Sequence, residues 1–471
     1  MPYSTKLYQR LSTLSLNELK RFQEFLDSPF FNCQLPVRKL FALLTDFHPV
    51  YEVDEKWIFR ELFPGEPYKD SRLRSLRTKL LKLLHQFLVQ MQLEGSPVVQ
   101  EELLVEAFRE KGLFEAAQQE VDKALATLEP ETIANFEDAR RWSFMERARL
   151  DLRYKMGERP SALEAGDLFL SLDHYHLARR FELLVGIEVY GKVWDQETVF
   201  TGEMEARIMA ERSGLTGHPL IAIYHQLLTS LRHNVDSQVL RKLREMIELH
   251  HARMSKEELL NIHNALVGKF VRELRRGVPG SLRNAFSIYQ DMHRYQLIFG
   301  AGGVTIHLVR NIVAAGARLK EFKWTSRFLE EALPHLDANR RDGTYHFGSA
   351  QLAYHRGDYG EAKRHLLQVE FTDPKVRLSA QNLLLKCYFE TRETEAFFLR
   401  ETVRRYLHRR AEFPGDFRQG YLNFLNLVAQ LYDLRWKLGA KKNATQLRSR
   451  LDRYDSFFNR EWVLEQLGLL T

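Results

Sequence analysis

An all-α fold is what this sequence predicts, and three observations favour it. Gly (25 residues) and Pro (14 residues) are sparse among 471 residues, which favours long helices joined by short connections. Two capping boxes, Ser15 with Glu18 and Ser255 with Glu258, indicate the beginnings of helices. Apolar residues then recur at helical spacing, and no alternating strand pattern accompanies them. We therefore expect helix in more than about two-thirds of the residues and almost no strand.

Residues 1–95 are expected to form an N-terminal helical domain. The helix after the Ser15 capping box ends at Pro29, because proline cannot continue a helix. Two further short helices each end before a proline, and Asp54 opens the second of them. Asp70 is then expected to cap a long helix whose leucines recur on one side, leaving its arginines and lysines on the other side.

A pattern of Gly, aromatic and Ala residues recurs later in the chain. In its clearest copy Gly357 permits a tight turn between two helices and Tyr359 packs across the hairpin. The small side chains of Ala350 and Ala362 let the two helices approach, and Pro374 begins the next hairpin. Further blocks of this kind begin at Gly112, Gly157, Gly280, Lys320 and Thr391. The Thr391 block begins 34 residues after Gly357.

These blocks resemble the tetratricopeptide repeat, most specifically at Gly112 and Gly357. Together with the Asp27-Ser28-Pro29-Phe30-Phe31-Asn32 turn and the leucine-rich helix after Asp70, they make most of the chain similar to uncharacterised bacterial helical-repeat proteins. That resemblance implies a fold and no particular activity. The expected architecture is an N-terminal helical unit followed by an α-solenoid of tetratricopeptide-like helical hairpins, with C-terminal capping helices.

Four parts are expected along the chain. Residues 1–95 form the N-terminal helical domain, and residues 96–275 form irregular helical hairpins. Their repeat register is left open between residues 130 and 275. Residues 276–412 carry the tetratricopeptide-like repeats. Residues 413–471 supply capping helices, which would cover the apolar face that a terminal repeat otherwise exposes to water.

The motifs of common catalytic and cofactor sites are missing from the sequence. It has no phosphate loop, no His-Glu-x-x-His, no Gly-x-Ser-x-Gly and no Cys-x-x-Cys. Gly300-Ala301-Gly302-Gly303 lacks the preceding strand of a dinucleotide-binding turn, so we expect an inter-helix loop there. Cys33 and Cys387 are far apart without neighbouring ligands, and adjacent His250 and His251 point in different directions on a helix. We therefore expect a non-catalytic protein without cofactor or metal.

The resemblance implies a protein-binding groove. In tetratricopeptide arrays the first helix of each hairpin lines a concave face that receives a segment of another protein. Counting back from the Lys320, Gly357 and Thr391 blocks, the matching positions are His307, Arg310, Ala314, Arg318, Thr344, Phe347, Gln351, Tyr354, His355, Leu378, Gln381, Leu385 and Tyr388. Arginine, amide and imidazole groups beside aromatic rings suit an acidic or carboxylate-bearing peptide with apolar anchors. The N-terminal domain is expected to offer a second contact surface.

Nucleic-acid binding is the alternative function, and an unrecognised enzyme is a further one. The chain is mildly basic, with a formal net charge of +7 and a pI near 9.1. Basic residues are densest at Arg72, Arg74, Arg77, Lys79 and Lys82, at Arg404, Arg405, Arg409 and Arg410, and at Arg435, Lys437, Lys441, Lys442, Arg448, Arg450 and Arg453. Such clusters could hold phosphates, but they are also typical of a solvated helix face with interspersed acids.

The sequence also carries an expectation about location. No run approaches the roughly 20 apolar residues that span a bilayer. The opening residues lead into an amphipathic stretch and not into the apolar core of a signal peptide. A cytoplasmic protein is therefore expected, without membrane insertion.

Overall fold

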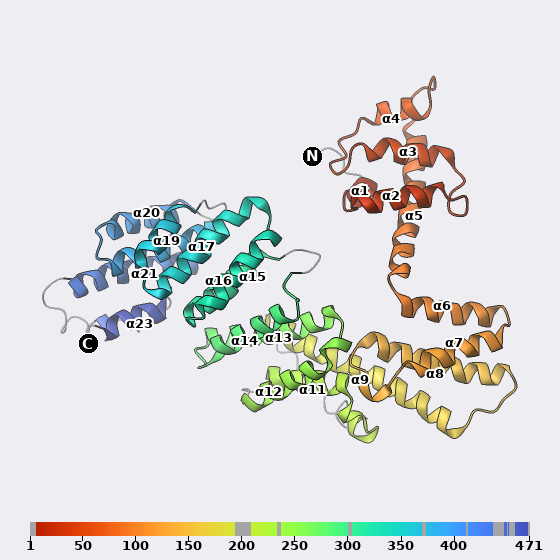
Figure 1. Cartoon of the computed structure of the whole chain (residues 1–471). Coiled ribbons are helices and arrows are strands. Elements are labelled where there is room, and N and C mark those ends of the chain that lie inside the picture. Colours follow the sequence, from red (N-terminus) through yellow and green to blue (C-terminus); the bar gives the residue numbers. More distant parts are fainter. Residues whose placement is uncertain are drawn as a thin grey trace. The chain divides into compact units, whose positions relative to one another are not determined.

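The computed structural model describes residues 6–193, 209–232, 237–299, 304–369, 374–410, 413–436, 447–449, 451 and 457–469. Helices account for 80% of the chain, and these ranges contain no strand. The prediction of an all-α fold is confirmed (Figure 1). The predicted loop at residues 300–303 lies outside the described residues.

The chain folds as two compact units. Unit 1 comprises Met1–Arg180 with Met204–Ala222, and unit 2 comprises Phe181–Glu203 with Ile223–Thr471. The division therefore falls inside the segment 96–275 that the sequence grouped as irregular hairpins, and each unit is described by itself below.

Unit 1 begins with five helices around one apolar core. They are α1 (Lys6–Leu11), α2 (Leu16–Asp27), α3 (Leu35–Thr45), α4 (Glu55–Leu62) and α5 (Asp70–Glu94). The Ser15–Glu18 capping box is formed, and the Asp54 side chain accepts from the Lys56 N–H. The N-cap of α5 is Lys69, so Asp70 is its first helical residue and not the predicted cap.

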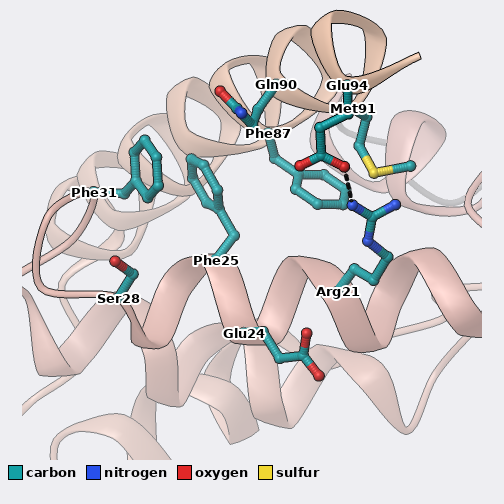
Figure 2. Close-up of a pocket in the computed structure, with 9 residues that line it drawn as sticks. All are labelled: Arg21, Glu24, Phe25, Ser28, Phe31, Phe87, Gln90, Met91 and Glu94. Carbon is teal, nitrogen blue, oxygen red and sulfur yellow. Dashed lines mark hydrogen bonds and ion pairs between the residues drawn. The ribbon is translucent and has the colours of Figure 1, made fainter.

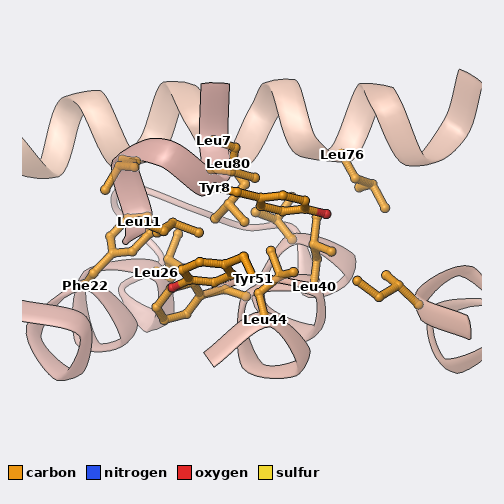
Figure 3. Close-up of a cluster of buried hydrophobic side chains, with 14 of the residues drawn as sticks. Leu7, Tyr8, Leu11, Phe22, Leu26, Leu40, Leu44, Tyr51, Leu76 and Leu80 are labelled. Carbon is orange, nitrogen blue, oxygen red and sulfur yellow. The ribbon is translucent and has the colours of Figure 1, made fainter. Parts of the chain in front are cut away.

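The core of these five helices is rich in leucine and aromatic rings (Figure 3). Leu7, Tyr8 and Leu11 of α1 pack in one cluster with buried residues of α2, α3 and α5. The Tyr8 and Tyr51 rings stack at 5.7 Å between centroids. Every member of this cluster lies between residues 7 and 87, so the segment predicted as an N-terminal domain has a core of its own.

Unit 1 continues with helices that pack in sequence order. They are α6 (Pro97–Glu110), α7 (Phe114–Ala126), α8 (Phe136–Lys155) and α9 (Ala162–Val193), and the last enters unit 2 at Phe181. Helix α7 contacts both α6 and α8. Small buried residues, Ala117, Ala124 and Ala148, lie in the cluster that joins these three helices.

Unit 2 consists of further consecutive helices. They are α11 (Pro219–Arg232, with its first turn in unit 1), α12 (Ser237–His250), α13 (Lys256–Arg275), α14 (Ser281–Arg294), α15 (Ile306–Arg318), α16 (Phe322–Ala332), α17 (Ala338–Arg356), α18 (Tyr359–Leu367), α19 (Pro374–Glu390), α20 (Glu395–Arg409), α21 (Gly415–Trp436) and α23 (Arg460–Gly468). The Ser255–Glu258 capping box opens α13, and Pro374 begins α19, as predicted. Neighbouring helices contact one another from α13 to α21. Their reading as a tetratricopeptide solenoid stays a prediction.

One turn geometry ends many of the helices. At Gly357 φ is 90°, the Gly357 N–H donates to Tyr354 O at 3.0 Å, and the Asp358 N–H donates to Ala353 O at 2.9 Å. This pair of bonds is the Schellman arrangement, which satisfies two carbonyls at a helix C-terminus. The same bonds and a positive φ occur at Gly112, Gly157, Gly277, Gln296, Lys320 and Arg392.

The observed turn positions differ from the predicted block positions in two places. The left-handed residue is Arg392 where the sequence pattern began the block at Thr391, so the spacing from Gly357 is 35 residues. Gly277 closes the turn after α13, whereas Gly280 precedes α14 as its N-cap. The pattern missed both because a turn position can be held by arginine, and because a second nearby glycine also has positive φ.

Small residues allow close helix packing in the hairpins. Ala350 and Ala362 are fully buried between α17 and α18. A Cβ added to Gly316 of α15 would lie 2.0 Å from Thr325 Oγ1 of α16 and 2.9 Å from a Phe286 ring carbon. These contacts leave no room for a larger side chain, in keeping with the role predicted for small residues.

Candidate functional site

The first-helix face is the surface where the sequence placed a protein-binding groove. We define it as the predicted positions on α15, α17 and α19 that keep some exposure: His307, Arg310, Ala314, Arg318, Gln351, Tyr354, His355, Gln381 and Tyr388. His307 and Arg318 are exposed, and the other seven are half-buried. These positions lie on α15, α17 and α19, and α17 contacts both α15 and α19.

Phe347 does not belong to an exposed groove. Its side chain is 5% exposed and packs in the same buried cluster as Ala350 and Ala362. Thr344, Leu378 and Leu385, counted with it from the sequence, are also buried. The expectation of exposure was wrong at these four positions. Phe347 packs with residues of α18 and α19, and Leu378 and Leu385 pack with residues of α20 and α21.

Tyr354 and His355 are more enclosed than an open groove would make them. Burial raises the pKa of Tyr354, so its hydroxyl stays protonated. Burial, with the charges of Lys386, Arg318 and Lys320, lowers the pKa of His355 to about 4. His355 is therefore a neutral imidazole near pH 7, able to donate one hydrogen bond and accept another.

Helix α23 covers one end of the first-helix face. Arg318 of α15 forms an ion pair with Glu461. Lys386 Nζ of α19 donates to Asn459 Oδ1 at 2.8 Å and lies 5.4 Å from the Trp462 ring. Part of the surface predicted to receive another protein is thus occupied by the chain's own C-terminal segment.

Trp462 anchors this segment in the core of unit 2. Its ring lies 5.1 Å from Phe389 of α19 and 6.0 Å from Phe424 of α21, and its side chain is 6% exposed. Gln466 donates to Glu390 at 2.8 Å and accepts from Arg435 at 2.5 Å. The sequence predicted a capping helix here. It did not predict that this segment contacts α15 and α19.

Lys386 is a feature that sequence reasoning missed. Burial and the neighbouring Arg318 lower the pKa of its ammonium group to about 8. A single lysine between apolar residues of α19 carries no motif, so only its tertiary surroundings reveal this shift.

Two glutamines of the first-helix face carry unsatisfied acceptors. The carboxamide oxygens of Gln351 on α17 and Gln381 on α19 are buried, and no group in the described part of the chain donates to either. A buried acceptor without a donor costs about 1–3 kcal/mol.

The basic clusters are partly neutralised by acids. Arg72, Arg74 and Arg77 each pair with a carboxylate, the last with Glu55 at 2.8 Å. In the second cluster Arg404 lies 3.8 Å from Glu401. Lys437, Lys441, Lys442, Arg450 and Arg453 lie outside the described residues.

A separate candidate site, the α2/α5 pocket, lies in the N-terminal part of unit 1 (Figure 2). Its volume is about 290 Å³. It is lined by Arg21, Glu24, Phe25, Ser28, Phe31, Phe87, Gln90, Met91 and Glu94. Phe25 and Phe87 follow the apolar spacing of their helices, and no periodicity shows that an opening remains between two helices.

No protein family, no curated protein and no solved structure matches the chain. Its predicted relation to tetratricopeptide repeats therefore rests on the residues themselves. None of the described helices has both the length and the apolar character needed to cross a membrane. Within the described residues, no three His, Cys, Asp or Glu side chains gather in a way that could hold a metal ion.

Proposed function

We propose that the protein is a non-catalytic, cytoplasmic scaffold that binds another protein along the first-helix face of a tetratricopeptide-like array. The single observation that carries this proposal is the pair of unsatisfied carboxamide oxygens at Gln351 and Gln381. They lie on two consecutive first helices, α17 and α19, which contact each other. Both side chains are half-buried, so polar groups repeat along neighbouring helices where a partner segment would lie.

The rest of the face suggests the chemistry of that segment. On α15, His307 is an exposed hydrogen-bonding side chain and Arg318 is an exposed cation. On α19, Tyr388 presents a half-buried ring. An acidic peptide could pair with Arg318, which would have to exchange its ion pair with Glu461. The ion pairs within the basic clusters favour this proposal over nucleic-acid binding, because they reduce the charge left for phosphates.

A double substitution tests the role of the glutamines. Gln351→Leu with Gln381→Leu removes both acceptors while keeping similar side-chain volume. Stability should stay the same or rise, because an unsatisfied buried polar group is replaced by an apolar one. Binding of the natural partner should weaken by about tenfold or more, the equivalent of roughly 1.4 kcal/mol.

The measurement is quantitative capture of proteins by the full-length chain, with urea denaturation in parallel. Gln368→Leu, at an exposed glutamine that follows α18, is the matched control and should change neither result. Undiminished capture by the double variant would contradict the proposed face. A loss of stability would show that the two oxygens have donors and are structural.

A further inference from the structure

The α2/α5 pocket is built from two matching rows of side chains. Arg21, Glu24, Phe25 and Ser28 follow one another at helical spacing along α2 and its C-cap. Phe87, Gln90, Met91 and Glu94 do the same along α5. Two helices that each present residues at i, i+3, i+4 and i+7 form the kind of groove that receives a third helix.

The floor of the pocket is aromatic and already ordered. Phe25 and Phe87 are buried, with their ring centroids 5.7 Å apart. Phe31, from the turn after α2, stacks on Phe25 at 4.0 Å. Met91 adds an unbranched side chain, which adapts to ligands of different shape.

An exposed ring extends this apolar surface. Phe30 is 86% exposed and meets Phe31 edge to face at 4.9 Å. A large apolar side chain in water beside an open pocket is typical of an interaction site. The pocket volume of about 290 Å³ lies at the lower end of the range for small-molecule sites, and fits one or two protein side chains.

The rim of the pocket carries a net negative charge. Arg21 pairs with Glu94, so these two charges offset each other. Glu24 also lines the pocket and has no ion pair with any group of the described chain. One carboxylate therefore remains to pair with a cation on a ligand.

We propose that the α2/α5 pocket binds an amphipathic helix of another protein, with a Leu or Phe side chain on the aromatic floor and a Lys or Arg beside Glu24. The paired rows on α2 and α5 determine the helical form of the ligand. The three phenylalanines and Met91 determine its apolar anchor, and the uncompensated carboxylate determines its basic flank. This site lies in unit 1 and is independent of the first-helix face in unit 2.

Selection from a displayed library of helix-forming peptides tests this proposal on the full-length protein. Peptides of about 20 residues exceed the length of roughly 12–15 residues below which isolated helices are marginal in water. We expect enrichment of sequences with Leu or Phe anchors one turn apart and with Lys or Arg on the flank. Selected peptides should bind Gln90→Trp about tenfold more weakly, because the indole fills the pocket.

Two matched controls separate the pocket from general effects. Gln92→Trp places the same ring at an exposed position two residues further along α5 and should bind as the wild type does. Glu24→Lys should weaken binding of basic peptides, whereas Glu61→Lys, at an exposed position of α4, should not.

Three outcomes would overturn the proposal. They are no enrichment, enrichment of acidic flanks, and equal binding to Gln90→Trp and Gln92→Trp. Binding of a small apolar dye that Gln90→Trp abolishes, without any peptide enrichment, would assign the pocket to a small molecule instead. Substitution of Gln351 and Gln381 should leave peptide binding unchanged, so the two proposals can fail separately.

Discussion

Among single residues, His174 has the most unusual environment in unit 1. Its side chain is fully buried between the rings of Trp142 and His218, with centroids 5.7 and 5.2 Å away. Neither ring nitrogen has a hydrogen-bond partner among the described residues. Burial, with a smaller contribution from His218, lowers the pKa of His174 from 6.5 to about 3. Folding therefore favours the neutral ring.

Acid should consequently destabilise unit 1 through His174. Because the unfolded chain binds this proton more readily, stability is fully present above pH 6.5 and falls between 6.5 and about 3. The expected loss is about 1.4 kcal/mol for each pH unit below 6.5. Urea denaturation from about pH 7 to about pH 5 should show a smaller loss for His174→Leu than for the wild type. Parallel losses in the two proteins would contradict a buried neutral histidine.

Ala362 tests the packing of the clearest hairpin. Its Cβ is fully buried in the cluster with Phe347 and Ala350. Ala362→Leu should overpack this contact and lower the free energy of unfolding by about 1–3 kcal/mol. Ala338→Leu, at the exposed first residue of α17, is the control and should have little effect. An unchanged urea midpoint for Ala362→Leu would mean that the hairpin is packed differently.

Among the elements, α23 is the one whose position changes the functional interpretation. It is short, nine residues, yet Trp462, Val463 and Leu467 are all buried. The sequence indicates a helix there through its apolar spacing, but it contains no sign that Glu461 and Asn459 meet Arg318 and Lys386. Those contacts join residues 143 and 73 positions apart, and local patterns carry no information at that range.

Trp462→Ala should therefore destabilise the packing of α23 strongly, although this helix is only nine residues long. Removing a buried indole lowers the free energy of unfolding by about 3–5 kcal/mol. We expect the destabilisation at the end of the first-helix face that α23 covers. Leu464→Ala is the control on the same helix, since Leu464 is 39% exposed. Leu464→Ala should lower the melting temperature much less than Trp462→Ala does. Equal effects would show that α23 is not anchored by Trp462.

For the whole molecule, sequence reasoning succeeded where the signals are local. Capping boxes at Ser15 and Ser255, and the proline that begins α19, were placed correctly because each depends on a few neighbouring residues. The turn registers near Gly277 and Arg392 were displaced, since several residue types can adopt a positive φ. The burial of Phe347 and the α2/α5 pocket depend on how separate helices pack, which periodicity alone does not specify.

The central claim is that another protein binds along the first-helix face, and site-specific photo-crosslinking tests it most directly. A photoreactive side chain at exposed His307 of α15 should form an adduct with a protein partner in cells. The same side chain at exposed Arg364 of α18, a second helix of a hairpin, should not. Equal protein adducts at both positions, or an adduct with nucleic acid at His307, would contradict the claim.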